Sequence, residues 1–129
     1  MAGVIVLDAS VLIGHFERND AHHEAATELL LASVDHDFVA SVVSLAEIYV
    51  GAARRNRIAD IEQMVAELRI AASPLPATAA RRLSEIRIAT ALKLPDCCVL
   101  YAAEQHGAAV ATFDVVLAAA AQRLGLAVA

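Results

Sequence analysis

Apolar residues fall into short blocks along the chain, and the spacing within the blocks is of two kinds. Nearly continuous apolar runs occupy residues 4–7, 37–41, 69–73 and 108–112. Runs of this length are typical of strands that are buried on both faces of a parallel sheet. A last run at 126–129 predicts a strand at the edge of that sheet.

Between these runs, apolar residues recur every three to four positions, which is the period of a helix with one buried face. Pro95 suits the first turn of a helix, and Gly107 suits the position just after one. Ser10 and Ser44 are the predicted N-caps of two further helices. The predicted helices cover residues 10–16, 21–33, 44–55, 58–68, 77–92, 95–106 and 115–125.

The helix predicted at 21–33 carries two further features. We expect Ala25, Leu29 and Ala32 on its inner face. His22 and His23 are adjacent in its first turn and are candidate metal ligands. Neighbouring histidines on an exposed turn are more often simply solvated, and we expect solvated side chains here.

Strands and helices alternate from one end of the chain to the other. This order predicts an α/β fold, with a central parallel sheet of four to five strands and helices on both faces. A length of 129 residues suits one domain, so we expect residues 1–129 to form a single domain. No apolar run is as long as a bilayer span, and no signal peptide is recognisable. We expect a cytoplasmic protein without a membrane segment.

Composition narrows the possible partners. The net charge is −5, which argues against a protein that coats nucleic acid by charge alone, although it does not exclude a nuclease. Arginines do cluster, at positions 54, 55 and 57 and again at 81, 82 and 87. Cys97 and Cys98 are adjacent and cannot join distant segments, and no second pair completes a zinc site, so we expect them in the core.

Four acidic residues stand at places where a sheet of this kind gathers ligands. Asp8 follows the first strand, Asp114 follows the strand at 108–112, Asp96 lies in the first turn of a helix, and Glu47 lies on the helix at 44–55. Ligands in such folds bind outside the carboxyl ends of the strands, where the strand order reverses. Glu47 has another reading, because Ser44 and Glu47 have the spacing of a capping box.

If these carboxylates converge, they repel one another unless a cation neutralises them. Oxygen ligands favour Mg²⁺ or Mn²⁺, and the lack of histidine or cysteine beside the acids makes zinc a poor candidate. Ser10 and Thr112 each lie two residues from an acid, so each is a candidate to orient a carboxylate, or equally to cap a helix. Such a site can hydrolyse phosphodiester bonds.

Several segments resemble, in order, the motifs of the PIN-domain ribonucleases, and most of all the VapC-type toxins of bacterial toxin–antitoxin pairs. These segments are IVLDAS, AEIYVG, LPDCCVLYAAEQHGA and VATFD, and the likeness spans nearly the whole chain. The resemblance implies a PIN-like three-layer fold, with Asp8, Glu47, Asp96 and Asp114 as catalytic metal ligands. It makes Ser10 and Thr112 supporting hydroxyls.

The same resemblance implies Mg²⁺- or Mn²⁺-dependent cleavage of RNA, a homodimer, and inhibition by a VapB-type antitoxin whose C-terminal segment crosses the active site. One position departs from the pattern. Val116 stands where many relatives carry a further acid, so the resemblance does not extend to a complete second metal site. One ion, or a second ion recruited with RNA, is the hypothesis for this chain.

For RNA binding, we expect phosphate contacts from Arg54, Arg55 and Arg87. The apolar residues around Leu29 and Leu30 and at 45–50 form a candidate groove for an amphipathic partner helix, but core packing explains most of the same residues equally well.

Other functions fit the sequence less well. A phosphorelay receiver needs a late lysine after a strand, but Lys93 precedes a helix and is the only lysine. A phosphatase with an aspartate nucleophile needs a second aspartate where Ser10 stands. A non-catalytic RNA-binding or protein-interaction module on the same scaffold is the alternative to the nuclease.

Overall fold

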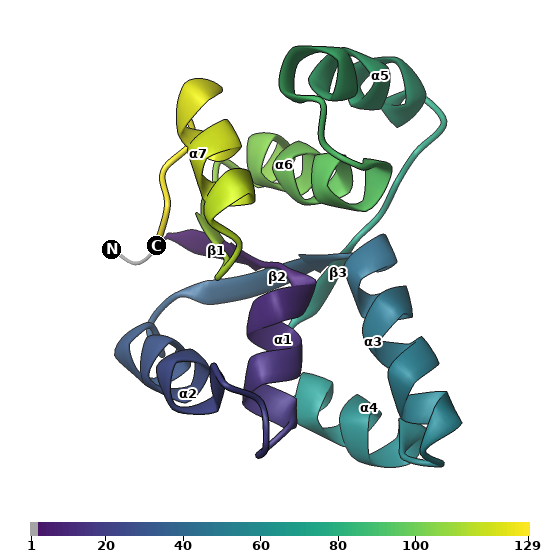
Figure 1. Cartoon of the computed structure of the whole chain (residues 1–129), viewed down its shortest axis with the longest axis vertical. Coiled ribbons are helices and arrows are strands. Elements are labelled where there is room, and N and C mark those ends of the chain that lie inside the picture. The colour runs from purple at the N-terminus through teal and green to yellow at the C-terminus, as the bar shows by residue number, and fades with distance from the viewer. Residues whose placement is uncertain (1–2) are drawn as a thin grey trace.

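The computed structural model describes residues 3–129, which form a four-stranded parallel sheet with helices on both faces (Figure 1). The strand order is β3-β2-β1-β4, and Val6 of the central strand lies opposite Val39 and Val110. The strands are β1 (Val4–Leu7), β2 (Asp37–Ser41), β3 (Ala71–Ser73) and β4 (Ala109–Ala111). The predicted parallel sheet is confirmed. The run at 126–129 lies parallel to β4 at the edge of the sheet, as predicted, but it forms only an isolated bridge between Val110 and Val128 and not a full strand.

Seven helices cover the sheet within the described part of the chain. Helices α5, α6 and α7 lie on one face, and α1 to α4 lie on the other (Figure 1). None of them has the length and apolarity that a membrane crossing requires. They are α1 (Ala9–Phe16), α2 (His23–Ala32), α3 (Val42–Arg54), α4 (Ile58–Glu67), α5 (Ala79–Thr90), α6 (Leu94–His106) and α7 (Val115–Arg123).

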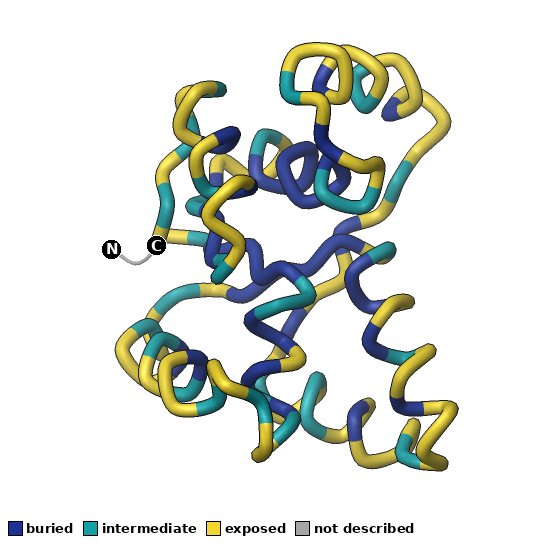
Figure 2. The backbone as a smooth tube through the Cα atoms, in the orientation of Figure 1, coloured by how far each residue is buried: buried dark blue, intermediate teal, exposed yellow. Residues whose placement is uncertain are grey.

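Each face of the sheet has its own hydrophobic core, because successive side chains of a strand point to opposite faces. Val6 packs in the core under α5, α6 and α7, whereas its neighbours Ile5 and Leu7 pack in the core under α1, α2 and α3. Figure 2 shows the buried residues concentrated in the sheet and on the helix sides that face it.

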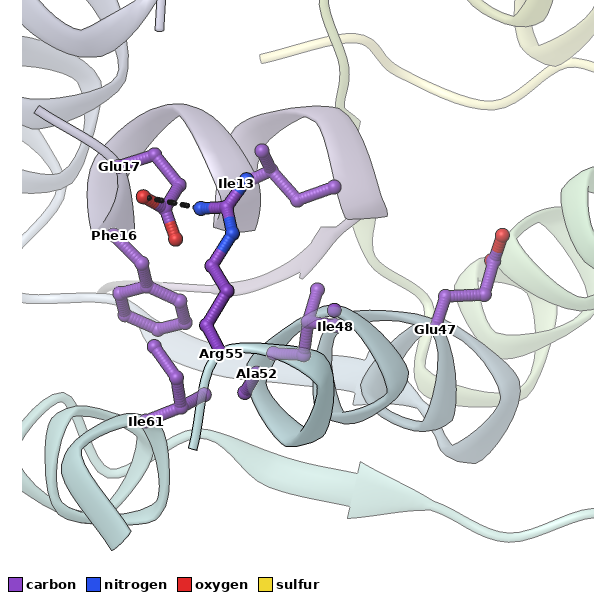
Figure 3. A pocket seen from close by; sticks show the side chains of 9 residues that line it. Ile13, Phe16, Glu17, Glu47, Ile48, Ala52, Arg55 and Ile61 are labelled. Carbon is purple, nitrogen blue, oxygen red and sulfur yellow. Dashed lines mark ion pairs between the residues drawn. The ribbon is translucent and has the colours of Figure 1, made fainter. Parts of the chain in front are cut away.

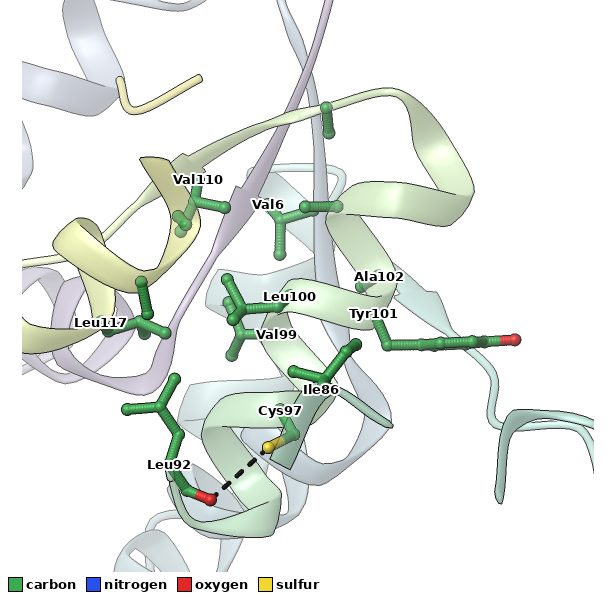
Figure 4. Close-up of a cluster of buried hydrophobic side chains, with 14 of the residues drawn as sticks. Val6, Ile86, Leu92, Cys97, Val99, Leu100, Tyr101, Ala102, Val110 and Leu117 are labelled. Atoms are coloured by element: carbon green, nitrogen blue, oxygen red, sulfur yellow. Dashed lines mark hydrogen bonds between the residues drawn. The ribbon is translucent and has the colours of Figure 1, made fainter. Parts of the chain in front are cut away.

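Helix α6 is buried along most of its length, and every residue from Cys97 to Ala103 is buried. Its Leu100 contributes to the same core as Val110 and Leu117 (Figure 4). The Cys97 thiol donates a hydrogen bond to the Leu92 carbonyl oxygen, with Sγ to O at 3.6 Å. Both cysteines are buried and free, as predicted.

Two predicted N-caps lie at the wrong residue. Asp8, and not Ser10, caps α1 by accepting from the Val11 amide. Ser41, and not Ser44, caps α3 by accepting from the Val43 amide. In both places the helix starts directly after the strand, so the last polar side chain of the strand end reaches the free amides first. The capping box of Ser44 and Glu47 therefore does not form.

The inner face of α2 is also shifted by one residue from the prediction. Ala26 and Leu30 are buried, whereas Ala25 and Ala32 are exposed and Leu29 is half-buried. The contact between α2 and α1 determines which face of α2 is buried. The two helices are close here, because a Cβ built on Gly14 would lie only 3.3 Å from the Cβ of Ala26. Only an alanine facing a glycine lets the two helices approach this closely.

Candidate functional site

Asp8 is a buried carboxylate at the carboxyl end of β1, only 5% exposed. Its Oδ1 accepts hydrogen bonds from the Ser10 hydroxyl at 2.7 Å and from the Val11 amide at 3.1 Å. Its Oδ2 accepts one from the Thr112 hydroxyl. Burial of a carboxylate is costly unless such donors satisfy it, and together the three donors fix the direction of both oxygens.

The loop after β4 is joined to the loop after β1 by the same hydroxyl groups. The Ser10 Oγ accepts from the Phe113 amide at 3.0 Å, and the Thr112 Oγ1 accepts from the Asp114 amide at 2.9 Å. Strands β1 and β4 are neighbours on the side where the strand order reverses. The site residues of both loops therefore meet at the position where parallel α/β sheets bind ligands.

Glu47 and Asp96 belong to this site electrostatically. Glu47 projects from α3, away from the ion pair at the other end of the adjoining pocket (Figure 3). Partial desolvation raises the pKa of Glu47, and the charges of Asp96 and Asp8 raise it further. Desolvation also raises the pKa of Asp96, as do the charges of Asp114 and Asp8, while Lys93 opposes them. Each of the four predicted acids thus has at least one other member of the set close enough to act on it or be acted on.

Asp114 is exposed and caps α7. Its Oδ1 accepts from the Val116 amide at 2.9 Å and from the Leu117 amide at 3.2 Å. The Val116 side chain is 61% exposed, so this turn offers no second carboxylate.

Basic residues compensate these acids only in part, through the charge of Lys93 near Asp96. Within residues 3–129, none of the four forms an ion pair. The same residues contain no group of three His, Cys, Asp or Glu side chains close enough together to hold an ion. Mg²⁺ does not need such a group, because it commonly keeps several waters and binds through one or two carboxylates. The donor set consists of carboxylate oxygens that no ion pair neutralises within residues 3–129, and it fits that ion.

The predicted arginines have different surroundings. Arg55 pairs with Glu17, with Nη1 to Oε2 at 2.9 Å (Figure 3). Arg54 is exposed and makes no ion pair within the described residues. Arg87 donates from Nη1 to the Leu92 carbonyl oxygen at 2.8 Å, which holds the turn before α6.

An apolar pocket lies beside Glu47, between α1, α3 and α4 (Figure 3). Its lining includes Phe16, Ile48 and Ile61, with Glu47 and Arg55 also present. The candidate groove predicted from sequence joined residues 45–50 to Leu29 and Leu30. Leu30 lines a separate pocket near the end of α4, and Leu30, Leu45 and Ile48 all belong to the buried core on this face of the sheet, so core packing accounts for these residues.

Sequence reasoning missed one contact at the site. The ring of His22 stacks on that of Phe113, with centroids 4.5 Å apart and planes 11° from parallel. His22 is exposed, as expected, but one face of its ring lies against Phe113. His23 was expected to be solvated, yet its Nδ1 lies 2.9 Å from the Gly14 carbonyl oxygen. The only local signal was an aromatic residue, Phe113, in an otherwise polar turn.

Comparisons with known proteins agree with the fold described above. A family model described as PIN domain matches residues 5–124. No curated protein sequence matches the chain.

Solved structures resemble the chain over most of its length. One is a toxin-antitoxin complex from Klebsiella pneumoniae, 22% identical over 86% of this chain and 87% of that chain, with TM-score 0.73. Another is FitAcB from Neisseria gonorrhoeae, 23% identical over 96% and 95%, with TM-score 0.70. A third is VapBC2 from Rickettsia felis bound to a promoter DNA fragment, 14% identical over 98% and 97%, with TM-score 0.69. At these identities the similarity shows the fold alone.

Proposed function

Because the chain belongs to the PIN-domain family, we propose that it is a metal-dependent ribonuclease that acts as a VapC-like toxin. The observation that carries the proposal is a group of four acids near the junction of β1 and β4. Neighbouring carboxylates raise the pKa values of Glu47 and Asp96, and none of the four forms an ion pair within residues 3–129. An arrangement that is unfavourable by itself becomes favourable when a cation binds.

Asp8, Glu47, Asp96 and Asp114 are the proposed ligands of Mg²⁺ or Mn²⁺. When bound, such an ion polarises the phosphodiester and a water molecule, which is the chemistry that hydrolysis requires. The hydroxyls of Ser10 and Thr112 position Asp8, because both donate to its carboxylate. Desolvation and neighbouring acids raise the pKa values of Glu47 and Asp96, and a bound cation would relieve this unfavourable electrostatic free energy.

A protein partner is part of this proposal. The solved structures similar to this chain include a toxin-antitoxin complex and VapBC2 bound to DNA. We propose that a VapB-type antitoxin blocks the acidic site in the cytoplasm and that the toxin forms a homodimer. The pocket beside Glu47 is the proposed docking position, because Glu47 lines it and an occupant there would contact this one of the four acids.

RNA cleavage by purified protein tests the catalytic assignment. We expect wild-type protein to cleave single-stranded RNA when Mg²⁺ or Mn²⁺ is added, and to stop when the ion is chelated. Asp8→Asn and Asp96→Asn should lower the rate by at least about a hundredfold, since each removes a charge from the proposed ion site. Asp37→Asn, on an exposed aspartate at the opposite end of the strands, is the matched control.

The second candidate is an RNA-binding module without catalysis. It is favoured by the absence, among residues 3–129, of a ready three-ligand metal cluster. The same assay separates the two functions. If the protein binds RNA but does not cleave it at any metal concentration, the nuclease assignment is rejected and the RNA-binding module is supported.

A further inference from the structure

Two aromatic rings from distant parts of the chain form a stack at the rim of the acidic site. Phe113 lies between Thr112, which donates to Asp8, and Asp114. His22 precedes α2 and covers one face of the Phe113 ring, with 4.5 Å between the centroids. Phe113 is half-buried against the core on the α1 side of the sheet, whereas His22 is exposed.

The backbone holds both residues in place. The Phe113 amide donates to Ser10 Oγ at 3.0 Å, so the turn that carries this ring is tied to the residue that binds Asp8. The His22 amide donates to Asp20 Oδ1 at 2.9 Å. The His22 carbonyl oxygen accepts from the Ala26 amide at 2.8 Å, which fixes His22 to the start of α2.

Close packing on α1 adds a further restraint. A Cβ built on Gly14 would lie 3.4 Å from the His22 Cβ. The His22 imidazole therefore lies against the Phe113 ring on a rigid support. Because its position is already restrained, its exposed ring face can bind a ligand with little loss of side-chain entropy.

From this geometry we propose that His22, supported by Phe113, stacks against an unpaired base of the RNA substrate. The inference rests on the proposed ribonuclease function and adds a base-binding subsite to it. Bases stack on aromatic side chains without needing a positive charge, and such stacking is a common means of binding single strands. A protein with a net charge of −5 gains affinity in this way despite repelling phosphate at long range.

The position of the stack determines which base it contacts. Phe113 is directly adjacent in sequence to Asp114, so a base on His22 belongs to a nucleotide close to the phosphate at the acids. Arg18, exposed and without an ion pair in the part of the chain that is described, lies four residues before His22 and is available for a neighbouring phosphate. A base inside a duplex has both faces covered, so this subsite selects single-stranded RNA or loops.

Binding of a short single-stranded RNA to the Asp96→Asn protein tests the inference in the presence of Mg²⁺. The RNA carries the fluorescent base 2-aminopurine at one position, and the position is changed from one oligonucleotide to the next. We expect stacking to change its fluorescence at one position. Adding His22→Ala should abolish this signal and weaken binding about tenfold, whereas His22→Phe should restore both.

His36→Ala is the matched control, because His36 lies before β2 at the amino ends of the strands. Phe113→Leu is a second test that keeps an apolar side chain in the core and removes the supporting ring. It should also weaken binding, and thermal unfolding of every variant shows whether the fold is kept.

The possible results are distinct. Loss of the fluorescence signal with His22→Ala, its return with His22→Phe and no effect of His36→Ala would support the subsite. Equal binding by the His22→Ala and His36→Ala proteins, with wild-type protein cleaving RNA, would overturn the subsite alone. Absence of both binding and cleavage in wild-type protein would reject the ribonuclease function and the subsite with it.

Discussion

At Asp8, three hydrogen bonds compensate a buried carboxylate and also fix the orientation of its oxygens. Glu47 and Asp96 have a different environment, because no hydrogen bond or ion pair within residues 3–129 satisfies their carboxylates. Their pKa values are raised by desolvation and by neighbouring acids. At the scale of single residues, the acidic site therefore stores unfavourable electrostatic free energy, as functional sites often do.

This repulsion predicts that Asp96→Asn raises the thermal stability of the metal-free protein. The raised pKa means that the folded state binds more protons than the unfolded state between the two pKa values, so wild-type stability falls as pH rises through this window. The asparagine variant lacks that loss. We expect its melting temperature at pH 7 to exceed the wild-type value by a few degrees.

The difference in melting temperature between the two proteins should shrink below about pH 4. At such pH values Asp96 of the wild-type protein becomes protonated in both the folded and the unfolded state. Thermal unfolding followed by circular dichroism from acid to neutral pH measures this difference. Asp37→Asn should show no such gain, and an Asp96→Asn protein less stable than wild type at pH 7 would contradict the assigned repulsion.

At the scale of secondary-structure elements, three helices begin at the acidic site. Asp8 caps α1, Asp114 caps α7, and Asp96 lies in the first turn of α6. The amino end of a helix carries a partial positive charge and free amides, so each helix start stabilises the carboxylate placed there. The starts of α1, α6 and α7 thus help to hold these three acids in position.

Asp114 allows its capping role to be separated from its charge. Asp114→Ala removes both hydrogen bonds to α7 and should lower the free energy of unfolding by about 1 kcal/mol. Asp114→Asn keeps an oxygen acceptor and should lose far less stability. If the charge binds the metal, both variants should lose cleavage activity by a similar factor. Chemical denaturation measures the stability of the variants, and the cleavage assay measures their activity. Full activity in Asp114→Asn would show that Asp114 caps α7 and does not bind the metal.

At the scale of the whole molecule, the sheet separates two hydrophobic cores, and the acidic site lies where the connections of both faces begin. Helix α6 supplies much of one core, and Leu100 at its centre is completely buried. The position of Asp96 depends on this packing, because the same rigid helix carries both residues.

Truncation of Leu100 should therefore affect the entire domain. We expect Leu100→Ala to lower the free energy of unfolding by about 2–5 kcal/mol, the range for a large cavity in a close-packed core. Leu94→Ala on the same helix is the matched control, since Leu94 is 52% exposed. Its effect should stay within about 0.5 kcal/mol. Urea denaturation measures both, and equal losses would mean that the core under α5, α6 and α7 contributes little.

Several elements were predictable from local pattern. The predicted bounds of β1 and β2 agree with the structure, and α6 starts one residue earlier than predicted and ends at the predicted residue, His106. Continuous apolar runs and the Pro95 and Gly107 signals are properties of adjacent residues, so they need no knowledge of the rest of the fold. The placement of Asp8 and Asp114 after strands follows in the same way, while their role as metal ligands stays a prediction.

Other features depended on competition between residues that are equally suitable in sequence. Asp8 and Ser10 are both good N-caps, and the direct exit of α1 from β1 selects Asp8. Ser10 is left free to connect Asp8 to the loop after β4. The inner face of α2 was decided by Gly14, a residue of another helix.

The amino-acid sequence by itself determined the order of strands and helices and the four acidic positions, because hydrophobic period and turn residues act over a few neighbouring residues. Only the tertiary structure decided that Thr112 reaches Asp8, that Arg55 pairs with Glu17, and that His22 lies on Phe113. These contacts join residues far apart in the chain, and their free energy depends on how the packed helices place two side chains that no local pattern relates.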